Sequence, residues 1–438
     1  MQRRFRSLWC KANKLLTANN NFRIVLNPWF HPPILRLVRC LSTDFPVGAP
    51  SATPAGGGGG DDGERRSKKL FTPGPLGVSP TVRAALTRDL GSRDGEFIAL
   101  VKSIREQLVD IAELPAEKYT AVLMQGSGTF AVESVLQSIS DRTKKVLILA
   151  SGAYGRRMGE ICLKADLPHT VVEFAENEPV QLSEVRRVVQ SGVWTCVCVV
   201  HCETTSGVVN HIDEIGHAVK SLGPDTFYVV DAMSSFGGVV ENYETADFII
   251  SSANKCLQGV PGFGFVIADK NKLKQCQGRS ASLSLDLFEQ WRGLESSGQF
   301  RFTPPTHVLL AFAQALRELK QEGGVPARAK RYAENNAIIK RRLKSLGFER
   351  FVPEDSDDGH IITSFKYPAH PAFSFDRFYQ ELSNKGQLIY PGKVTNADCF
   401  RIGNIGHLFP TDMEHLGDCI VQVLMDMGVP TPVSSSQL

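Results

Sequence analysis

The feature that most constrains the fold of this chain is a regular alternation along its middle part. From Leu70 onward, short apolar runs lead into Gly-rich turns and then into segments with helical periodicity. The apolar runs are TAVLMQ (120–125), KVLILA (145–150), TCVCVV (195–200), TFYVV (226–230) and ADFIISS (246–252). Strands that are apolar on both faces and alternate with helices predict an α/β fold with a mostly parallel sheet covered by helices. Ligands of such sheets bind at the carboxyl ends of the strands, where the polar motifs of this chain fall.

The C-terminal part of the chain has a different pattern of apolar and polar segments. After about residue 315, two long amphipathic helical segments precede HIITSFKY, FSFDRFYQELSNKG, FRIGNIG and a last helical stretch, a pattern that predicts a smaller α/β domain. We therefore expect a large domain over residues 70–315, a small domain over 316–430 and a tail over 431–438. The 438 residues are sufficient for two or three domains of roughly 150 residues each.

The first 43 residues differ in composition from the rest. Arg and Lys are interspersed with Leu, Trp, Phe and Ile, and no acidic residue occurs before Asp44. This composition is typical of a mitochondrial targeting peptide, although a disordered basic tail has the same composition. Residues 44–69, with several prolines and a run of glycines, are expected to be a disordered linker. The C-terminal SQL differs from the peroxisomal signal SKL at its middle position, so a peroxisomal or cytoplasmic location is the alternative.

The overall composition argues against several classes of protein. A net charge of +3 is a small basic excess, concentrated at one end, and does not indicate a nucleic-acid-binding protein. No apolar run approaches the roughly 20 residues needed to cross a bilayer, so we expect no membrane partner. The ten cysteines include no CxxC pair, which favours a reducing compartment, and no metal site is predicted.

Three polar features follow the predicted strands, and each has an ordinary explanation when taken alone. The turn GSGTF (126–130) opens a helix, and its backbone N–H groups and hydroxyls could bind a phosphate or simply cap the helix. Asp231 follows FYVV directly; its carboxylate either faces the ligand crevice or caps the next turn. Lys255, one strand later, is either a solvated charge or a desolvated amine able to form an imine with a carbonyl.

The three features together match the three functional parts of pyridoxal 5′-phosphate. This cofactor has a phosphate, a ring nitrogen that works best when protonated, and an aldehyde. An anion cradle, the Asp231 carboxylate and the Lys255 amine correspond to these parts in turn. Tyr154 in SGAYG also follows a strand and offers an aromatic face for the ring. We therefore predict a pyridoxal phosphate site at the carboxyl edge of the sheet.

The sequence resembles the class V aminotransferases of pyridoxal-phosphate fold type I. The motifs that carry the resemblance are TPGP (72–75), GSGT, SGAYG, ETTSG (203–207), VDAMSSFG (230–237), SANKCLQGVPG and FRIGNIG (400–406), in the order found in that family. The match runs from Leu70 to about Gly428. The resemblance implies a large domain with a mostly parallel sheet and a smaller C-terminal α/β domain.

The resemblance also implies roles for individual residues around the cofactor. Lys255 would bond covalently to pyridoxal phosphate and carry the proton, Asp231 would pair with the ring nitrogen, and Tyr154 would stack on the ring. Contacts to the phosphate are implied for Ser127, Gly128, Thr129, Ser252 and Asn254.

Three further residues take their implied roles from the same resemblance. Thr204 would reach the ring hydroxyl, and Thr303 would reach the phosphate of a neighbouring subunit, which implies a homodimer. Arg401 would hold the acidic group of the substrate, although a structural arginine between the domains fits the spacing equally well. No role is predicted for GSRD (91–94), and His201 and Glu203 either brace the site or are ordinary strand-end polar groups.

Within the class, LFTPGPL, GSRD, CETTSG and DAMSSFGG are most similar to transaminases of 2-aminoethylphosphonate and pyruvate. The implied activity moves the amino group of 2-aminoethylphosphonate to pyruvate and yields phosphonoacetaldehyde and alanine. Alanine:glyoxylate (serine:pyruvate) aminotransferases are the nearest alternative. A protein that binds the cofactor without turnover is a third possibility, but it would have no need of Asp231, Lys255 and Arg401 together.

Overall fold

The computed structural model describes residues 67–353, 359–392, 394 and 397–433. These residues belong to the second of the two units into which the chain divides, Arg65–Leu438. The predicted targeting peptide (1–43) and most of the predicted linker (44–66) lie outside the described residues, as do residues 434–438 of the predicted tail. Among the described helices, none is long and apolar enough to cross a membrane.

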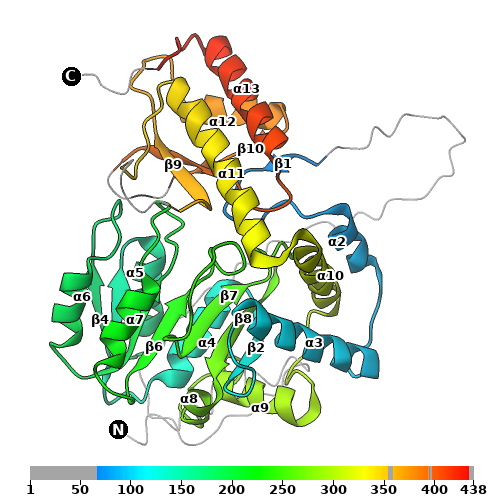
Figure 1. The fold of residues 1–438 in the computed structure, drawn as a ribbon, viewed down its shortest axis with the longest axis vertical. Coiled ribbons are helices and arrows are strands. Elements are labelled where there is room, and N and C mark those ends of the chain that lie inside the picture. Colours follow the sequence, from blue (N-terminus) through cyan, green and yellow to red (C-terminus); the bar gives the residue numbers. More distant parts are fainter. Residues whose placement is uncertain (1–66, 354–358, 393, 395–396, 434–438) are drawn as a thin grey trace, which may run out of the picture. The chain divides into compact units, whose positions relative to one another are not determined.

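A seven-stranded sheet forms the centre of the fold (Figure 1). In spatial order its strands are β2 (Tyr119–Gly126), β8 (Gly262–Asp269), β7 (Phe248–Ser252), β6 (Phe227–Asp231), β5 (Trp194–Val200), β3 (Lys145–Ala150) and β4 (His169–Glu173). The strands from β7 to β4 pair in parallel, whereas β8 is antiparallel to both β7 and β2. Because β2 and β7 both oppose β8, β2 runs in the same direction as β7. The carboxyl ends of β2, β7 and β6 therefore lie at one edge of the sheet.

The strands predicted from the apolar runs are confirmed as β2, β3, β5, β6 and β7, and their residues are almost all buried. Leu, Val and Ile on both faces require cover on both sides, which the helices provide. The helices of this part are α2 (Pro80–Ala84), α3 (Gly95–Ile111), α4 (Gly128–Ile139), α5 (Ala153–Lys164), α6 (Leu182–Val189), α7 (Ile212–Lys220), α8 (Lys270–Lys274) and α9 (Leu287–Ser297), with a 3₁₀ turn at Ala85–Thr87. α4 packs on β2, β7 and β8, α5 on β3 and β4, and α7 on β6.

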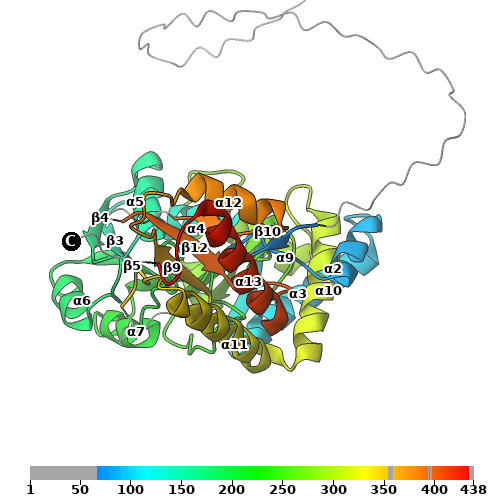
Figure 2. The same cartoon turned by 90° about the horizontal axis from the view of Figure 1, so that it is seen from above.

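The C-terminal part contains long helices and two small sheets. Its helices are α10 (Thr306–Glu322), α11 (Gly324–Ser345), α12 (Phe375–Asn384) and α13 (Pro410–Met427). A three-stranded antiparallel sheet has the order β11 (Tyr390–Pro391), β12 (Cys399–Gly403) and β9 (Ile362–Lys366), and β1 (Lys69–Leu70) pairs in parallel with β10 (Gln387–Leu388). α11 and α13 lie side by side in both views (Figure 1, Figure 2).

The expected fold class, an α/β fold with a mostly parallel sheet and a small C-terminal sheet, is confirmed. Separate apolar clusters lie under the large sheet and around β9, β12 and α13. The predicted boundary between residues 315 and 316 falls within α10, a continuous helix of 17 residues. The predicted linker end at residue 69 falls within β1, which pairs with β10 near the C-terminus. The division into two domains remains a proposal.

Candidate active site

A cavity of about 170 Å³ opens at the carboxyl edge of the large sheet. It contains eight of the eleven residues for which the sequence predicts a role: Ser127, Gly128, Thr129, Tyr154, Asp231, Ser252, Asn254 and Lys255. They arrive there because β2, β6 and β7 end at the same edge, at Gly126, Asp231 and Ser252. Residues separated by more than 120 positions along the chain are thereby brought into one cavity.

Lys255 follows β7 by three residues and lines this cavity. Its Nζ donates to the carbonyl oxygen of Pro73 at 2.8 Å. Burial lowers the pKa of Lys255 to about 8, because the charged form loses hydration there. An amine that is neutral near pH 8 is a competent nucleophile and proton acceptor.

The approach of Lys255 to the TPGP segment depends on Gly74. Gly74 has φ +109°, and a Cβ at this position would lie 2.8 Å from Lys255 Cδ and 2.9 Å from the carbonyl oxygen of Asn254. A side chain is therefore excluded both by the backbone conformation and by the space. The peptide bond between Gly74 and Pro75 is cis.

Asp231 is the last residue of β6 and its side chain is buried. One carboxylate oxygen accepts the backbone N–H of Met233 at 2.9 Å. Burial raises the pKa of Asp231 to about 6, an effect that nearby Glu203 increases and Lys255 and Arg157 oppose. A buried carboxylate with a single hydrogen bond is poised to pair with a cationic group placed in the cavity.

The first turn of α4 forms the predicted anion cradle. Ser127 is the N-cap residue of this 12-residue helix, but its hydroxyl makes no capping hydrogen bond. Ser127, Gly128 and Thr129 line the cavity, and the first turn of the helix has no side-chain cap. The helix dipole adds partial positive charge there, so the turn is suited to a phosphate.

Tyr154 lies in the first turn of α5, where Glu203 fixes the backbone. One carboxylate oxygen of Glu203 accepts the N–H of Tyr154 at 3.3 Å, and the other accepts the hydroxyl of Thr205 at 2.6 Å. Glu203 is fully buried, and burial raises its pKa. Glu203 thus braces the helix that carries Tyr154, which is one of the two roles that the sequence left open.

Arg401 lies on β12 and is fully buried. Its Nε donates to the carbonyl oxygen of Pro391 and its Nη1 to that of Thr204, both at 2.9 Å, and its guanidinium carbon lies 4.9 Å from the ring centroid of Tyr390. Nη2 has no hydrogen-bond partner among the described residues. Burial lowers the pKa of Arg401, whereas Tyr154, Tyr390 and Glu203 raise it. A buried guanidinium with one free nitrogen close to Tyr154 is suited to hold an acid.

The remaining predicted residues do not line the cavity. The hydroxyl of Thr204 is 2.7 Å from the hydroxyl of Ser234, and Thr303 is exposed, with its carbonyl oxygen accepting the Gln125 amide. The backbone N–H of His201 donates to the Asp231 carbonyl oxygen at 2.8 Å, and its Nε2 lies 3.1 Å from Glu241. In GSRD, Asp94 caps α3, away from the cavity.

No role was predicted from the sequence for six cavity residues: Gly74, Val132, Arg157, Met158, Ile161 and Met233. The guanidinium carbon of Arg157 lies 4.8 Å from the ring centroid of Tyr154. Its position three residues after Tyr154 on the same helix face was an available signal, since residues i and i+3 are neighbours on a helix. Gly74 and Met233 lie within TPGP (72–75) and VDAMSSFG (230–237), two motifs that carry the family resemblance, but no role was predicted for either residue.

The sequence matches a known protein family and several named relatives. The family described as aminotransferase class-V matches residues 79–382. A protein of Syntrophobacter fumaroxidans named 2-aminoethylphosphonate--pyruvate transaminase is 52% identical over 351 residues, which cover 79% of this chain and 94% of the relative. A protein of the same name from Lysinibacillus sphaericus is 47% identical over 355 residues, 80% of this chain and 96% of the relative.

Solved structures resemble the fold at lower sequence identity. A pyridoxamine-pyruvate aminotransferase from Mesorhizobium loti has a TM-score of 0.76 at 24% identity and covers 84% of this chain and 95% of its own. An alanine--glyoxylate aminotransferase from Nostoc sp. has a TM-score of 0.76 at 23% identity, with 82% and 95% covered. At these identities the likeness concerns the fold alone.

Proposed function

The chain belongs to the class-V aminotransferases, and we propose that within this family it transfers the amino group of 2-aminoethylphosphonate to pyruvate, giving phosphonoacetaldehyde and alanine. Relatives that carry this activity in their names are 46 to 52% identical to the chain and nearly coextensive with its matched part. The observation that carries the proposal is the meeting of a desolvated lysine, a buried carboxylate and an uncapped helix N-terminus in one cavity.

The cavity fits pyridoxal 5′-phosphate by the chemistry of its side chains. Ser127, Gly128 and Thr129 at the start of α4, with Ser252 and Asn254, would hold the phosphate, because all five line the cavity and carry hydroxyl, amide or backbone donors. Asp231 would pair with the ring nitrogen, Tyr154 would stack on the ring, and Lys255 would bond to the aldehyde carbon. Thr204 would reach the ring hydroxyl. When bound, this cofactor supplies an electron sink for the carbon that loses a proton.

Lys255 is the proton carrier of the proposed reaction. Its Nζ, neutral above about pH 8, takes a proton from the carbon that bears the amino group of the donor. In the second half-reaction it delivers a proton to the carbon that was the carbonyl carbon of pyruvate. The same nitrogen serves both directions, so the low pKa of Lys255 matters for both.

Arg401 holds the acidic end of each substrate in this proposal. Its Nε and Nη1 are committed to backbone carbonyls, so the planar group is fixed before substrate arrives. Nη2 and the second hydrogen of Nη1 remain for the phosphonate of the donor or the carboxylate of pyruvate. Orientation of the acid by a rigid guanidinium presents the reacting carbon to Lys255.

We also propose a homodimer and a mitochondrial location. Thr303 is exposed and does not line the cavity of its own chain, which fits the role of reaching the phosphate in a second copy. The acid-free, Arg-rich composition of residues 1–43 supports mitochondrial import. Both proposals rest on the sequence resemblance and composition.

The experiment that tests the function is a substrate panel. Purified protein loaded with pyridoxal phosphate is given 2-aminoethylphosphonate, alanine or serine as donor and pyruvate or glyoxylate as acceptor, and the amino acid formed is measured. We expect the phosphonate with pyruvate to have the highest kcat/KM. A preference for alanine with glyoxylate would assign the chain to that activity instead, and the absence of any turnover would identify a non-catalytic cofactor-binding protein.

A further inference from the structure

A single hydroxyl joins the segment that carries Lys255 to the loop that follows Arg401. Tyr332 lies on α11 and is fully buried. Its hydroxyl donates to the carbonyl oxygen of Cys256 at 3.2 Å, accepts the amide of Gln258 at 2.6 Å and accepts the N–H of Gly406 at 3.2 Å. A phenolic hydroxyl has one hydrogen to donate and two lone pairs, so every hydrogen-bonding position of Tyr332 is used.

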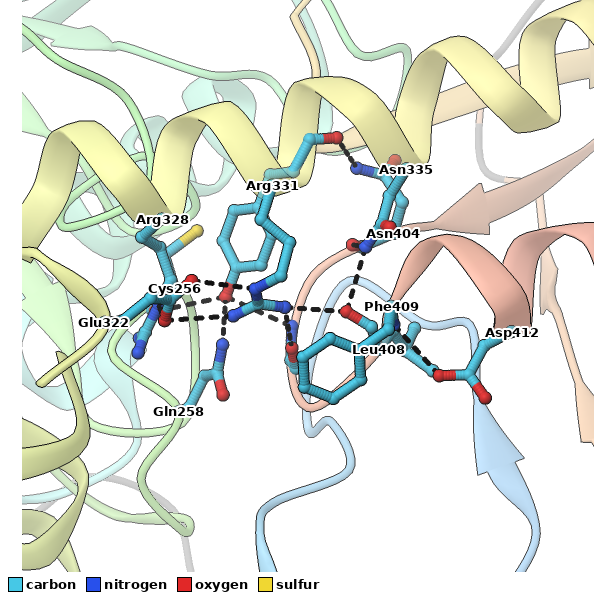
Figure 3. Close-up of polar contacts among 12 residues, drawn as sticks. Cys256, Gln258, Glu322, Arg328, Arg331, Asn335, Asn404, Leu408, Phe409 and Asp412 are labelled. Carbon is cyan, nitrogen blue, oxygen red and sulfur yellow. Dashed lines mark hydrogen bonds and ion pairs between the residues drawn. The ribbon is translucent and has the colours of Figure 1, made fainter.

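Neighbouring side chains of α11 reinforce both attachments (Figure 3). Arg328 donates to the same Cys256 carbonyl oxygen at 2.9 Å. On the other side, Arg331 donates to the carbonyl oxygen of Leu408 at 2.7 Å, and Asn335 donates to that of Asn404 at 3.1 Å. α11 therefore contacts two segments: the turn that carries Lys255 and loop 404–408.

The two arginines of α11 are themselves fixed by one carboxylate. Glu322, the last residue of α10, accepts Nε of Arg328 and Nε of Arg331, each at 2.7 Å. The arginines lower the pKa of Glu322 in spite of its partial burial, so the carboxylate stays ionised at neutral pH. The chain reverses between the two helices through Gly323, whose φ of +108° suits glycine.

The amine end of Lys255 is held by a segment that loop 404–408 also borders. Nζ of Lys255 donates to Pro73, and the residues that flank Pro73 are bonded to the C-terminal part: Gly403 N–H to the Phe71 carbonyl oxygen at 3.0 Å and His407 N–H to that of Gly77 at 2.9 Å. The backbone beside Lys255 is thus linked to loop 404–408 through Tyr332. The segment that accepts its amine is linked to the same part of the chain through residues 71–77.

We propose that Tyr332 is a positioning residue for Lys255, and that its hydroxyl fastens the Lys255–Gln258 turn to loop 404–408 so that the amine is held at the distance proton transfer requires. The proposal rests on the proposed transaminase function. Tyr332 does not line the cavity, so it acts through the backbone of the turn and not on substrate. A displacement of about 1 Å in a reacting group is sufficient to reduce a rate on the order of 100-fold.

The test compares Tyr332→Phe with a matched control. Phenylalanine keeps the ring in its apolar surroundings and removes only the hydroxyl. The control is Tyr119→Phe, which removes a hydroxyl that donates to the Ala246 carbonyl oxygen, also at 3.2 Å, outside the cavity. We expect Tyr332→Phe to lower kcat of both half-reactions about tenfold or more, with KM for the two acids nearly unchanged. Tyr119→Phe should lose thermal stability only.

A second measurement does not depend on turnover. In protein freed of cofactor, the labelling rate of Lys255 by an acylating reagent, followed by mass spectrometry over a range of pH, gives its apparent pKa. The wild type should give a pKa of about 8, and Tyr332→Phe should give a higher pKa because water reaches the loosened turn. If Tyr332→Phe does not fold, Gln258→Asn decides: Asn tolerates the φ of +59° at this position, but its amide is one methylene too short for Tyr332.

The outcomes separate the inference from the function on which it rests. Wild-type kcat and a wild-type labelling profile in Tyr332→Phe or Gln258→Asn, with only a lower Tm, would overturn the positioning role. If the wild type fails to transaminate any pair of substrates, the proposed function is wrong, and the labelling profile alone then decides whether Tyr332 orients Lys255.

Discussion

Replacement of Arg401 by lysine tests the assignment of the acid-binding group. Arg401→Lys keeps the positive charge but leaves one nitrogen where the guanidinium has three. Two of the three are bonded to Pro391 and Thr204 at 2.9 Å, and only Nη2 is unpartnered among the described residues. Lysine cannot hold both carbonyls and the acid at once, so either the orientation of the cation or its contact with substrate is lost.

The magnitude follows from the hydrogen bonds involved. Each charge-assisted hydrogen bond contributes about 1.5–3 kcal/mol, and the variant forfeits the paired geometry while it keeps the charge. We therefore expect a loss of about 2–4 kcal/mol in transition-state stabilisation, equal to a decrease of roughly 30- to 900-fold in kcat/KM for both substrates. KM should rise for 2-aminoethylphosphonate and for pyruvate, because in the proposed reaction both would place their acid at this position.

The assay needs a control for stability, since Arg401 also joins β12 to Thr204. Arg105→Lys provides it: Arg105 is partly buried, donates to the Ala121 carbonyl oxygen at 2.7 Å and to Thr120 at 2.8 Å, and lies outside the cavity. Both variants should lower Tm, and only Arg401→Lys should raise KM. Wild-type KM for every acid in Arg401→Lys would refute the reasoning and return Arg401 to a structural role.

Other substitutions and conditions test the remaining assignments. Lys255→Ala should abolish reductive trapping of the cofactor on the chain and lower turnover by several orders of magnitude, and turnover near the wild-type rate would exclude Lys255 as the anchor. Asp231→Asn should slow the proton-abstraction step in single-turnover kinetics. Because burial raises the pKa of Asp231 to about 6, its ionised form destabilises the fold above that pH, so the same variant should raise Tm of the cofactor-free protein more at pH 8 than at pH 5. The rate at which the cofactor-free wild type captures pyridoxal phosphate should rise with pH and level off above about 8, where Lys255 is neutral. A capture rate that does not change between about pH 6 and about pH 9, a range that spans this pKa, would contradict the lowered pKa of Lys255. Residues 1–69 fused to a fluorescent reporter should direct it to mitochondria, whereas a diffuse signal would favour the cytoplasm.

Much of the site could be predicted because it follows from strand ends. In a mostly parallel sheet, ligands bind at the carboxyl ends of the strands, so residues at those ends can be expected near the ligand. Asp231 ends β6 and the GSGTF turn lies at the end of β2, and the structure brings them together in one cavity with Ser252, which ends β7 and whose role the family resemblance implied. Lys255 required one further step, because it lies three positions beyond the end of β7.

The rest could not be predicted because it depends on contacts between distant segments. Gly74 is required by the position of the Lys255 side chain, 181 residues away, and the hydroxyl of Tyr332 finds its partners on two loops that no local pattern connects to α11. Strand β8 also escaped prediction, so the sheet is mixed at one end where a purely local interpretation gives parallel strands. Thr303 is a different case: its implied partner is a second copy of the chain, and the contacts of one chain do not test it.

The distribution of charge around the cavity suits the acids on both sides of the proposed reaction. Lys255 and Arg157 line the cavity and Arg401 lies beside it, whereas the carboxylates of Asp231 and Glu203 are buried and their pKa values are raised. Burial therefore reduces the negative charge of the two carboxyl groups, whereas the guanidinium groups remain charged at any ordinary pH. The excess of positive charge favours a phosphate at the α4 end and a carboxylate or phosphonate at the Arg401 end. In the proposed reaction Arg401 would recognise what these acids share, a set of oxygens on one centre, so discrimination between them would come from the total charge and size that the cavity accepts.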